Sequence, residues 1–276
     1  VVFCCFNGSQ KISRFTFERF LTILKGVPKS VLWFIDCADE TKTRLWEHAE
    51  KHGIERARIL FAPKLQNAFH LARYPLADLF LDTAPYGAHT TASDALWMGL
   101  PVLTLSGRSF ASRVCGSLVR AAGLPELVCE TPDAFVARAI ALGNDLATVR
   151  SYRSRLEAGR DSCSLFDMDK LTASLEALYL GMCDDYAAGR LPRPDLANLP
   201  AYFEAGIAHD HEAVELQAMA DYHGHYRRAL ARLHRARPMP ADNRLWNLAD
   251  IAKADGIHSV ATLDFAEPKR RKAAAG

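Results

Sequence analysis

The residues best placed to do chemistry lie close together around position 90. His89, Thr90 and Thr91 precede Asp94 where a small-residue loop leads from a predicted strand into a predicted helix. The first N–H groups of a helix lack partners inside the helix and lie at the positive end of its dipole, so they bind phosphate. Asp94, one turn after Thr90, can accept hydrogen bonds from ribose hydroxyls. The segment predicts a nucleotide site, with a nucleotide-sugar as the favoured ligand.

Two simpler interpretations apply inside this segment. Acidic residues are favoured in the first turn of a helix for dipole reasons alone, which is compatible with ribose binding by Asp94. We expect Thr90 or Thr91 to cap the helix, which leaves His89 free to contact the diphosphate or the sugar.

Gly8 and Lys11 lie in the loop that follows the first predicted strand. A lysine there can place its ammonium on a diphosphate, and a glycine lets the backbone approach closely. Most loop lysines are only solvated. The position of Lys11 nevertheless favours binding, because its loop and the threonine loop point into the same crevice of a parallel sheet.

His70 and Arg73 are three residues apart on a short predicted helix after the third strand. This spacing places both side chains on one helical face, where they could flank a base or a ribose. The alternative is an ordinary surface helix with a half-buried histidine.

Short apolar runs alternate with helical patterns along the first half of the chain. The runs are rich in Val, Leu, Ile and Phe and do not alternate with polar residues, as expected for strands covered on both faces. This pattern predicts an α/β fold with a doubly wound parallel sheet and a ligand site at the strands' carboxyl ends. The expected strands are 1–6, 30–35, 57–62, 77–82, 101–105 and 126–129, with helices near 14–24, 40–51, 66–73, 91–98, 111–122 and 132–142.

The rest of the chain is predicted to be helical. We expect a nucleotide-sugar-binding lobe over 1–189, a proline-rich linker over 190–200, and a helical region over 201–276 that ends in a solvated basic tail. The spacing of Gly224, Tyr226 and Ala229 resembles one helix of a tetratricopeptide unit, and an ordinary amphipathic helix is the alternative.

Composition excludes several other classes of protein. A hydrophobic content of 49% supports a real core, and a net charge of +2 gives no field for nucleic acid. The seven cysteines form no Cys-x-x-Cys pair, and no apolar run reaches the length of a membrane span, which together favour a reducing cytoplasm. The histidines near 209–211 and 223–225 have spacings unsuited to chelating one ion on a helix, so no metal site is expected there.

With these residues assembled, the chain resembles the carboxyl-terminal half of the catalytic region of the O-linked N-acetylglucosamine transferase and SPINDLY-like family, whose members are GT-B glycosyltransferases. The resemblance covers about residues 1–189. The matching segments are Phe6-Asn7, Lys11-Ile12, Val27 to Trp33, Leu76 to Thr83, His89-Thr90-Thr91, Asp94 to Trp97, Ala111 to Val114 and Leu178-Tyr179.

The resemblance implies that the chain binds a uridine diphosphate sugar without a metal ion or another cofactor. Two positions depart from the family pattern: Gly8 stands in place of a usual Gln, and Asn67 in place of a usual Lys. The implied roles are diphosphate binding by the catalytic Lys11, phosphate binding by Thr90 and Thr91, ribose binding by Asp94, framing of the uridine by His70 and Arg73, and contact of His89 with diphosphate and sugar.

The expected reaction is inverting transfer of N-acetylglucosamine from UDP-N-acetylglucosamine to Ser or Thr of an acceptor protein. GDP-fucose and UDP-glucose are alternative donors, a UDP-sugar epimerase is a further alternative, and a non-catalytic nucleotide-binding module is an alternative of another class. The resemblance also implies a missing amino-terminal lobe from the same parent protein. We therefore expect the chain alone to bind nucleotide without transferring sugar.

Overall fold

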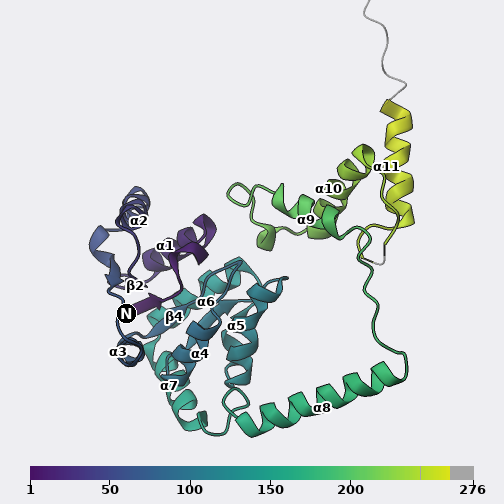
Figure 1. Ribbon diagram of the computed structural model, residues 1–276. Helices are drawn as coiled ribbons and strands as arrows, with labels where there is room; N and C mark the ends of the chain where they lie inside the picture. Colours follow the sequence, from purple (N-terminus) through teal and green to yellow (C-terminus); the bar gives the residue numbers. More distant parts are fainter. Residues whose placement is uncertain (243, 262–276) are drawn as a thin grey trace, which may run out of the picture. The chain divides into compact units, whose positions relative to one another are not determined.

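The computed structural model describes residues 1–242 and 244–261, with side chains to residue 256. Two compact units divide the chain, Val1–Asp184 and Asp185–Gly276 (Figure 1). The boundary falls within helix α8 (Met168–Ala187). The basic tail expected at the end of the chain lies outside the described residues.

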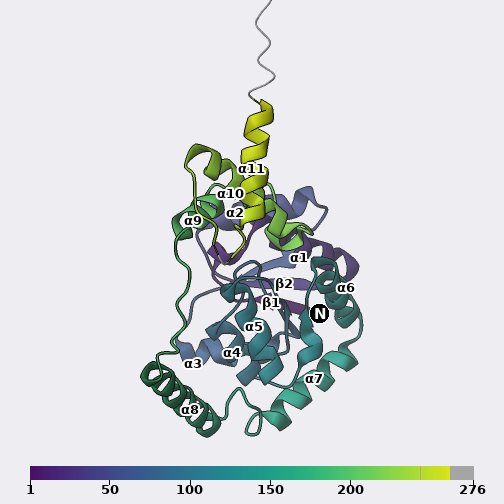
Figure 2. The same cartoon turned by 90° about the vertical axis from the view of Figure 1, so that its right-hand side faces the viewer.

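The first unit is built on a six-stranded parallel sheet with strand order β3-β2-β1-β4-β5-β6. Figure 2 shows β1 and β2 side by side near the centre of this unit. The strands are β1 (Val2–Cys5), β2 (Val31–Ile35), β3 (Ile59–Ala62), β4 (Leu79–Leu81), β5 (Val102–Leu105) and β6 (Val128–Cys129). The sequence-based prediction of a doubly wound α/β fold is confirmed.

The burial of the central strands explains why apolar and polar residues do not alternate in their sequences. All residues of β4 and β5 are buried, because the central strands are covered on both faces. Helix α6 (Pro132–Asn144) approaches this core closely: a Cβ placed on Gly143 would lie 2.7 Å from atoms of both Phe3 and Val27. Only glycine permits that contact between α6 and the β1 side of the core.

The connecting helices of the first unit are α1 (Arg14–Gly26), α2 (Asp39–Lys51), α3 (Asn67–Ala72), α4 (Thr90–Trp97), α5 (Phe110–Ala121), α6 (Pro132–Asn144) and α7 (Leu146–Gly159). Four of these helices, α1, α5, α6 and α7, begin at a residue whose side chain caps the helix. Ser13 accepts a hydrogen bond from the Thr16 N–H, and Ser109 and Ser112 form a capping box.

The second unit is helical over its described residues. It contains α9 (Leu199–Ile207), α10 (Tyr222–Ala236) and α11 (Leu248–Ala261), and α10 contacts both of the other helices (Figures 1 and 2). Their small core contains Ala201, Leu230, Met239, Trp246 and Ala254. The α10 helix buries Ala229 and Leu230, as an amphipathic helix would, and the tetratricopeptide repeat stays a prediction.

Two histidines of the second unit, His209 and His211, form hydrogen bonds with its own backbone. The Nε2 atoms of His209 and His211 lie 2.9 Å and 3.1 Å from the carbonyl oxygens of Val214 and Gly206.

No helix in the described part of the chain is both long and apolar enough to cross a bilayer.

Candidate functional site

The predicted site residues lie at the carboxyl ends of the strands, where the order of the sheet reverses between β1 and β4. Lys11 belongs to the short 3-10 helix η1 (Ser9–Lys11), which follows β1, and Gly87 belongs to the loop that follows β4. The Nζ atom of Lys11 donates to the Gly87 carbonyl oxygen at 2.9 Å. The structure therefore brings the lysine loop and the threonine loop together.

Lys11 has a second contact with the same loop. Its Nζ atom lies 3.8 Å from the ring centroid of Tyr86, within the range of a cation–π interaction. An ammonium has three donors, so the bond to Gly87 leaves two for a ligand. Both contacts hold the charge on the loop that precedes α4.

The loop after β4 is anchored by the buried carboxylate of Asp82. Its Oδ1 atom accepts from the N–H groups of Thr83 and Ala88 at 2.8 Å and 2.7 Å. Its Oδ2 atom accepts from the Thr104 hydroxyl at 2.7 Å. Burial raises the pKa of Asp82, and these donors act in the opposite direction. The carboxylate therefore fixes both ends of the turn that leads to α4.

Asn7, two residues after β1, links the loop after β1 to the loop after β4 by hydrogen bonds. Its Nδ2 atom donates to Asp82 Oδ1 at 3.1 Å and to the Thr83 hydroxyl oxygen at 2.8 Å. The Thr83 hydroxyl in turn donates to the Tyr86 carbonyl oxygen at 2.7 Å. Sequence reasoning missed Asn7, Asp82 and Thr83 as site residues. The available signal was a polar residue directly after each of two buried strands.

The start of α4 corrects one sequence-based expectation. The helix begins at Thr90, so neither Thr90 nor Thr91 is its cap; His89 occupies that position and makes no side-chain cap hydrogen bond. His89 is the N-cap because its carbonyl accepts the first hydrogen bonds of the helix, from the N–H groups of Ala92 and Ser93 at 3.0 Å and 3.1 Å. His89 is also tied to α5, since its Nε2 atom lies 3.3 Å from the Ala111 carbonyl oxygen.

The first turn of α4 offers donors to a ligand. Within the described chain, the N–H groups of Thr90 and Thr91 and their hydroxyls have no hydrogen-bond partner. Thr90 is exposed and Thr91 is half-buried. These groups form the positive end of a helix dipole, next to the loop that holds the Lys11 ammonium.

His70 and Asp94 come from different helices and interact with each other. Burial and the nearby positive charge of Arg73 lower the pKa of His70, while Asp94 opposes that shift. Burial raises the pKa of Asp94, and His70 opposes that shift. The Nε2 atom of His70 lies 3.3 Å from the Tyr74 hydroxyl, and its ring packs 5.6 Å from that of Phe6.

The structure shows the surroundings of three further predicted residues, Arg73, Asn67 and Gly8, which the sequence alone did not specify. Arg73 is 5% exposed, and both terminal nitrogens of its guanidinium donate to the Pro63 carbonyl oxygen at 3.0 Å. Arg73 therefore holds the loop between β3 and α3. Asn67 is the exposed first residue of α3. A side chain at Gly8 would collide with the terminal amide of Gln10.

The strand order and the polar loops at the strands' carboxyl ends define a Rossmann-like α/β domain. Domains of this class bind ligands at the point where the strand order reverses, which is here between β1 and β4. The model of glycosyl transferase family 41 matches residues 1–175. The chain belongs to glycosyl transferase family 41.

Several known proteins are similar to this region. A UDP-N-acetylglucosamine–peptide N-acetylglucosaminyltransferase of Caenorhabditis elegans is 35% identical over 189 residues, which cover 68% of this chain and 16% of that protein. A probable enzyme of the same name, SPINDLY of Solanum lycopersicum, is 33% identical over 70% of this chain and 21% of that protein. The chain thus spans about a fifth of the length of these relatives.

A solved structure agrees with the fold. An O-GlcNAc transferase of Thermobaculum terrenum, carrying the mutation K341M, superposes with a TM-score of 0.65 at 35% sequence identity. The superposition covers 69% of this chain and 37% of that one.

Proposed function

We propose that residues 1–184 form the donor-binding lobe of a protein O-glycosyltransferase that binds UDP-N-acetylglucosamine. The observation that carries this proposal is the bond between Lys11 and the Gly87 carbonyl, which holds a cation beside the unpaired N–H groups of Thr90 and Thr91. A diphosphate needs both kinds of donor at one point.

The diphosphate would lie between Lys11 and the first turn of α4. Lys11 is the proposed catalytic residue, because its ammonium meets the charge that develops on the diphosphate as the bond to the sugar breaks. The threonine N–H and hydroxyl groups hold the phosphate oxygens. His89, held by α5, lies beside them and contacts diphosphate and sugar.

The nucleoside would extend toward α3. Asp94 accepts hydrogen bonds from the ribose hydroxyls, with Asn67 near the ribose, and His70 flanks the uracil. Arg73 contributes by fixing the loop after β3, since its guanidinium is already bonded to the Pro63 carbonyl. Gly8 leaves the backbone beside the phosphates without a side chain of its own.

In the proposed reaction, the hydroxyl of an acceptor Ser or Thr attacks the anomeric carbon of the sugar. The bond from that carbon to the diphosphate oxygen breaks on the opposite face, so the configuration inverts, UDP leaves, and the proton of the hydroxyl is released to solvent. Lys11 and the α4 amides stabilise the leaving group by charge and hydrogen bonds. The names of the relatives support the donor and the acceptor class.

The decisive experiment is calorimetry of the purified chain with UDP, UDP-N-acetylglucosamine and GDP. We expect UDP and its sugar to bind at least tenfold more tightly than GDP, because His70 and Arg73 match the family positions that frame a uridine. Equal or tighter GDP binding would transfer the proposal to a GDP-sugar donor. Absence of binding by all three nucleotides would refute the assignment of the donor site.

A further inference from the structure

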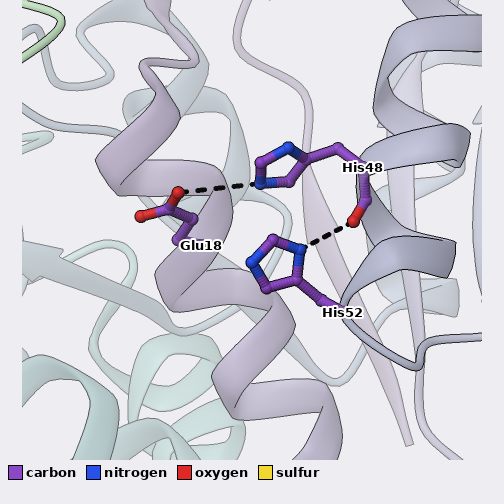
Figure 3. Close-up of side chains that lie close together, drawn as sticks. All are labelled: Glu18, His48 and His52. Carbon is purple, nitrogen blue, oxygen red and sulfur yellow. Dashed lines mark hydrogen bonds and ion pairs between the residues drawn. The ribbon is translucent and has the colours of Figure 1, made fainter.

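A cluster of two histidines and a glutamate lies outside the proposed nucleotide site. His48 lies in α2, and His52 follows one turn later at the carboxyl end of the same helix. Residues four apart face the same side of a helix, so the two rings stack, with centroids 4.4 Å apart. Glu18 reaches them from α1, and Figure 3 shows its carboxylate beside both imidazoles.

The spacing of the donor atoms suits a single metal ion. One ligand atom from each of Glu18, His48 and His52 lies within 4.8 Å of the other two. The Nε2 atom of His48 is 3.7 Å from Glu18 Oε1. Ligands bound at about 2.0–2.2 Å in a tetrahedral zinc site lie about 3.3 Å from one another. Small side-chain rotations of these half-buried residues would close the difference.

The hydrogen bonding of the histidines leaves ligand nitrogens available. The Nδ1 atom of His52 lies 2.8 Å from the His48 carbonyl oxygen, and a carbonyl only accepts, so Nδ1 carries the proton. The lone pair of His52 is therefore on Nε2. The Nε2 atom of His48 is buried and has no hydrogen-bond partner in the described part of the chain. A buried nitrogen without a partner is costly, and a metal ion would satisfy it.

The Glu18 carboxylate already has one positively charged neighbour. The Nε atom of Arg14 lies 4.0 Å from Glu18 Oε1 in an exposed ion pair. Such a pair contributes little free energy, so it competes only weakly with coordination.

We propose that Glu18, His48 and His52 bind a divalent transition metal of the Zn²⁺ class, with water as the fourth ligand. Two imidazoles and one carboxylate are a donor set that zinc favours. The ion would join α2 to α1. Helix α1 is in turn bonded to the loop before α4, because the Thr16 hydroxyl donates to the Ala84 carbonyl oxygen at 2.7 Å. The site would therefore stabilise the helix that supports the proposed diphosphate loop.

The test uses the full chain, without an affinity tag and stripped of metal by a chelator. Zn²⁺ is titrated by calorimetry, and Co²⁺ is used as a spectroscopic probe. We expect one ion per chain and the visible bands of tetrahedral Co²⁺ with nitrogen and oxygen ligands. At a Zn²⁺ concentration 100-fold above the Kd, the midpoint of thermal unfolding should rise by about 5–10 °C.

Variants distinguish this site from other donors. His48→Gln and His52→Gln should each weaken Zn²⁺ binding at least tenfold, and Glu18→Gln should weaken it less. The matched control is His223→Gln, a histidine of α10 in the second unit that is not one of the proposed ligands. A Cys183→Ser background removes the exposed thiol, which could also bind zinc.

The outcome is decided by the His52 variant, because His52 is half-buried and its loss should leave the fold intact. Unchanged Zn²⁺ affinity in His52→Gln, a Co²⁺ spectrum dominated by thiolate ligands, or no binding by the wild-type chain would each overturn the proposal. UDP affinity is measured in the same samples. Loss of UDP binding with intact Zn²⁺ binding would refute the donor site and leave this one standing.

Discussion

Replacing Lys11 with alanine tests the proposed diphosphate site most directly. Lys11 holds its ammonium 2.9 Å from the Gly87 carbonyl oxygen, in a half-buried position beside the first turn of α4. A charge-assisted hydrogen bond between the ammonium and a phosphate contributes a net free energy of about 1.5–3 kcal/mol. The net value is modest because the new bond replaces hydrogen bonds to water. We therefore expect Lys11→Ala to weaken UDP binding about 10- to 150-fold.

The comparison of two ligands identifies which part of the nucleotide Lys11 contacts. Calorimetry with UDP and with uridine separates the diphosphate from the nucleoside. The expected result is a large loss for UDP and a change of less than about twofold for uridine, whose binding involves no ammonium. Lys25→Ala is a matched control, since Lys25 is an exposed lysine near the end of α1.

Two results would refute this reasoning. Unchanged UDP affinity in a correctly folded Lys11→Ala chain would make Lys11 an ordinary surface lysine. An equal loss for UDP and uridine would show that Lys11 acts only by holding the loop through Gly87. Lys11→Arg helps to separate these cases, because it keeps the charge but changes the geometry of the donors.

Three further predictions concern stability. Asp82→Asn should lower the free energy of unfolding by about 1–3 kcal/mol, because an amide cannot accept all the bonds that the carboxylate now accepts; chemical denaturation measures this, and an unchanged midpoint would contradict it. The pKa of His70 is lowered, so the unfolded chain takes up a proton first as the pH falls below about 6.5, and stability should decline there. His70→Gln should flatten this decline in denaturation curves collected from pH 7.5 to 5, and an identical slope would refute it. Gly99→Ala should lower the free energy of unfolding by about 1 kcal/mol, because Gly99 has φ +76°. Gly181→Ala in α8 should be neutral or stabilising, because alanine favours a helix. Equal shifts of the thermal midpoint in the two variants would contradict this argument.

The sheet could be predicted from the sequence because local patterns specify it. Each apolar run became a strand, with ends shifted by only a few residues. Burial on both faces selects such runs in the central strands β4 and β5, whereas the edge strand β3 leaves Leu60 exposed. Gly99 illustrates such a local signal, because a glycine often follows the last residue of a helix: it has φ +76°, and the Leu100 N–H donates to the Ala95 carbonyl at 2.8 Å.

The details of the site depend on contacts between distant residues, which spacing does not reveal. The position of Arg73 on the Pro63 carbonyl and the network around Asp82 both require the folded sheet. The proposed metal site illustrates the same limit. His48 and His52 have a chelating spacing in the sequence, but Glu18 joins them only because α1 lies beside α2 in the fold.

The structure also makes a prediction about how Lys11 and Asp82 cooperate. Asp82 fixes the loop through the N–H groups of Thr83 and Ala88, and the Gly87 carbonyl that holds Lys11 lies in the same loop. Removing Asp82 should therefore release both the ammonium and the α4 donors from their binding geometry. Residues that act through one shared element have non-additive effects.

A double-mutant cycle measures this coupling. UDP affinity is determined for the wild type, Lys11→Ala, Asp82→Asn and the double variant, with thermal unfolding to confirm that each chain is folded. We expect the double variant to lose clearly less affinity than the product of the two single losses, with a coupling of about 0.5–3 kcal/mol. Strict additivity would mean that Lys11 reaches the diphosphate independently of the Asp82 loop. In that case the bond to Gly87 would be incidental, and preorganisation of the site would have to come from α4 alone.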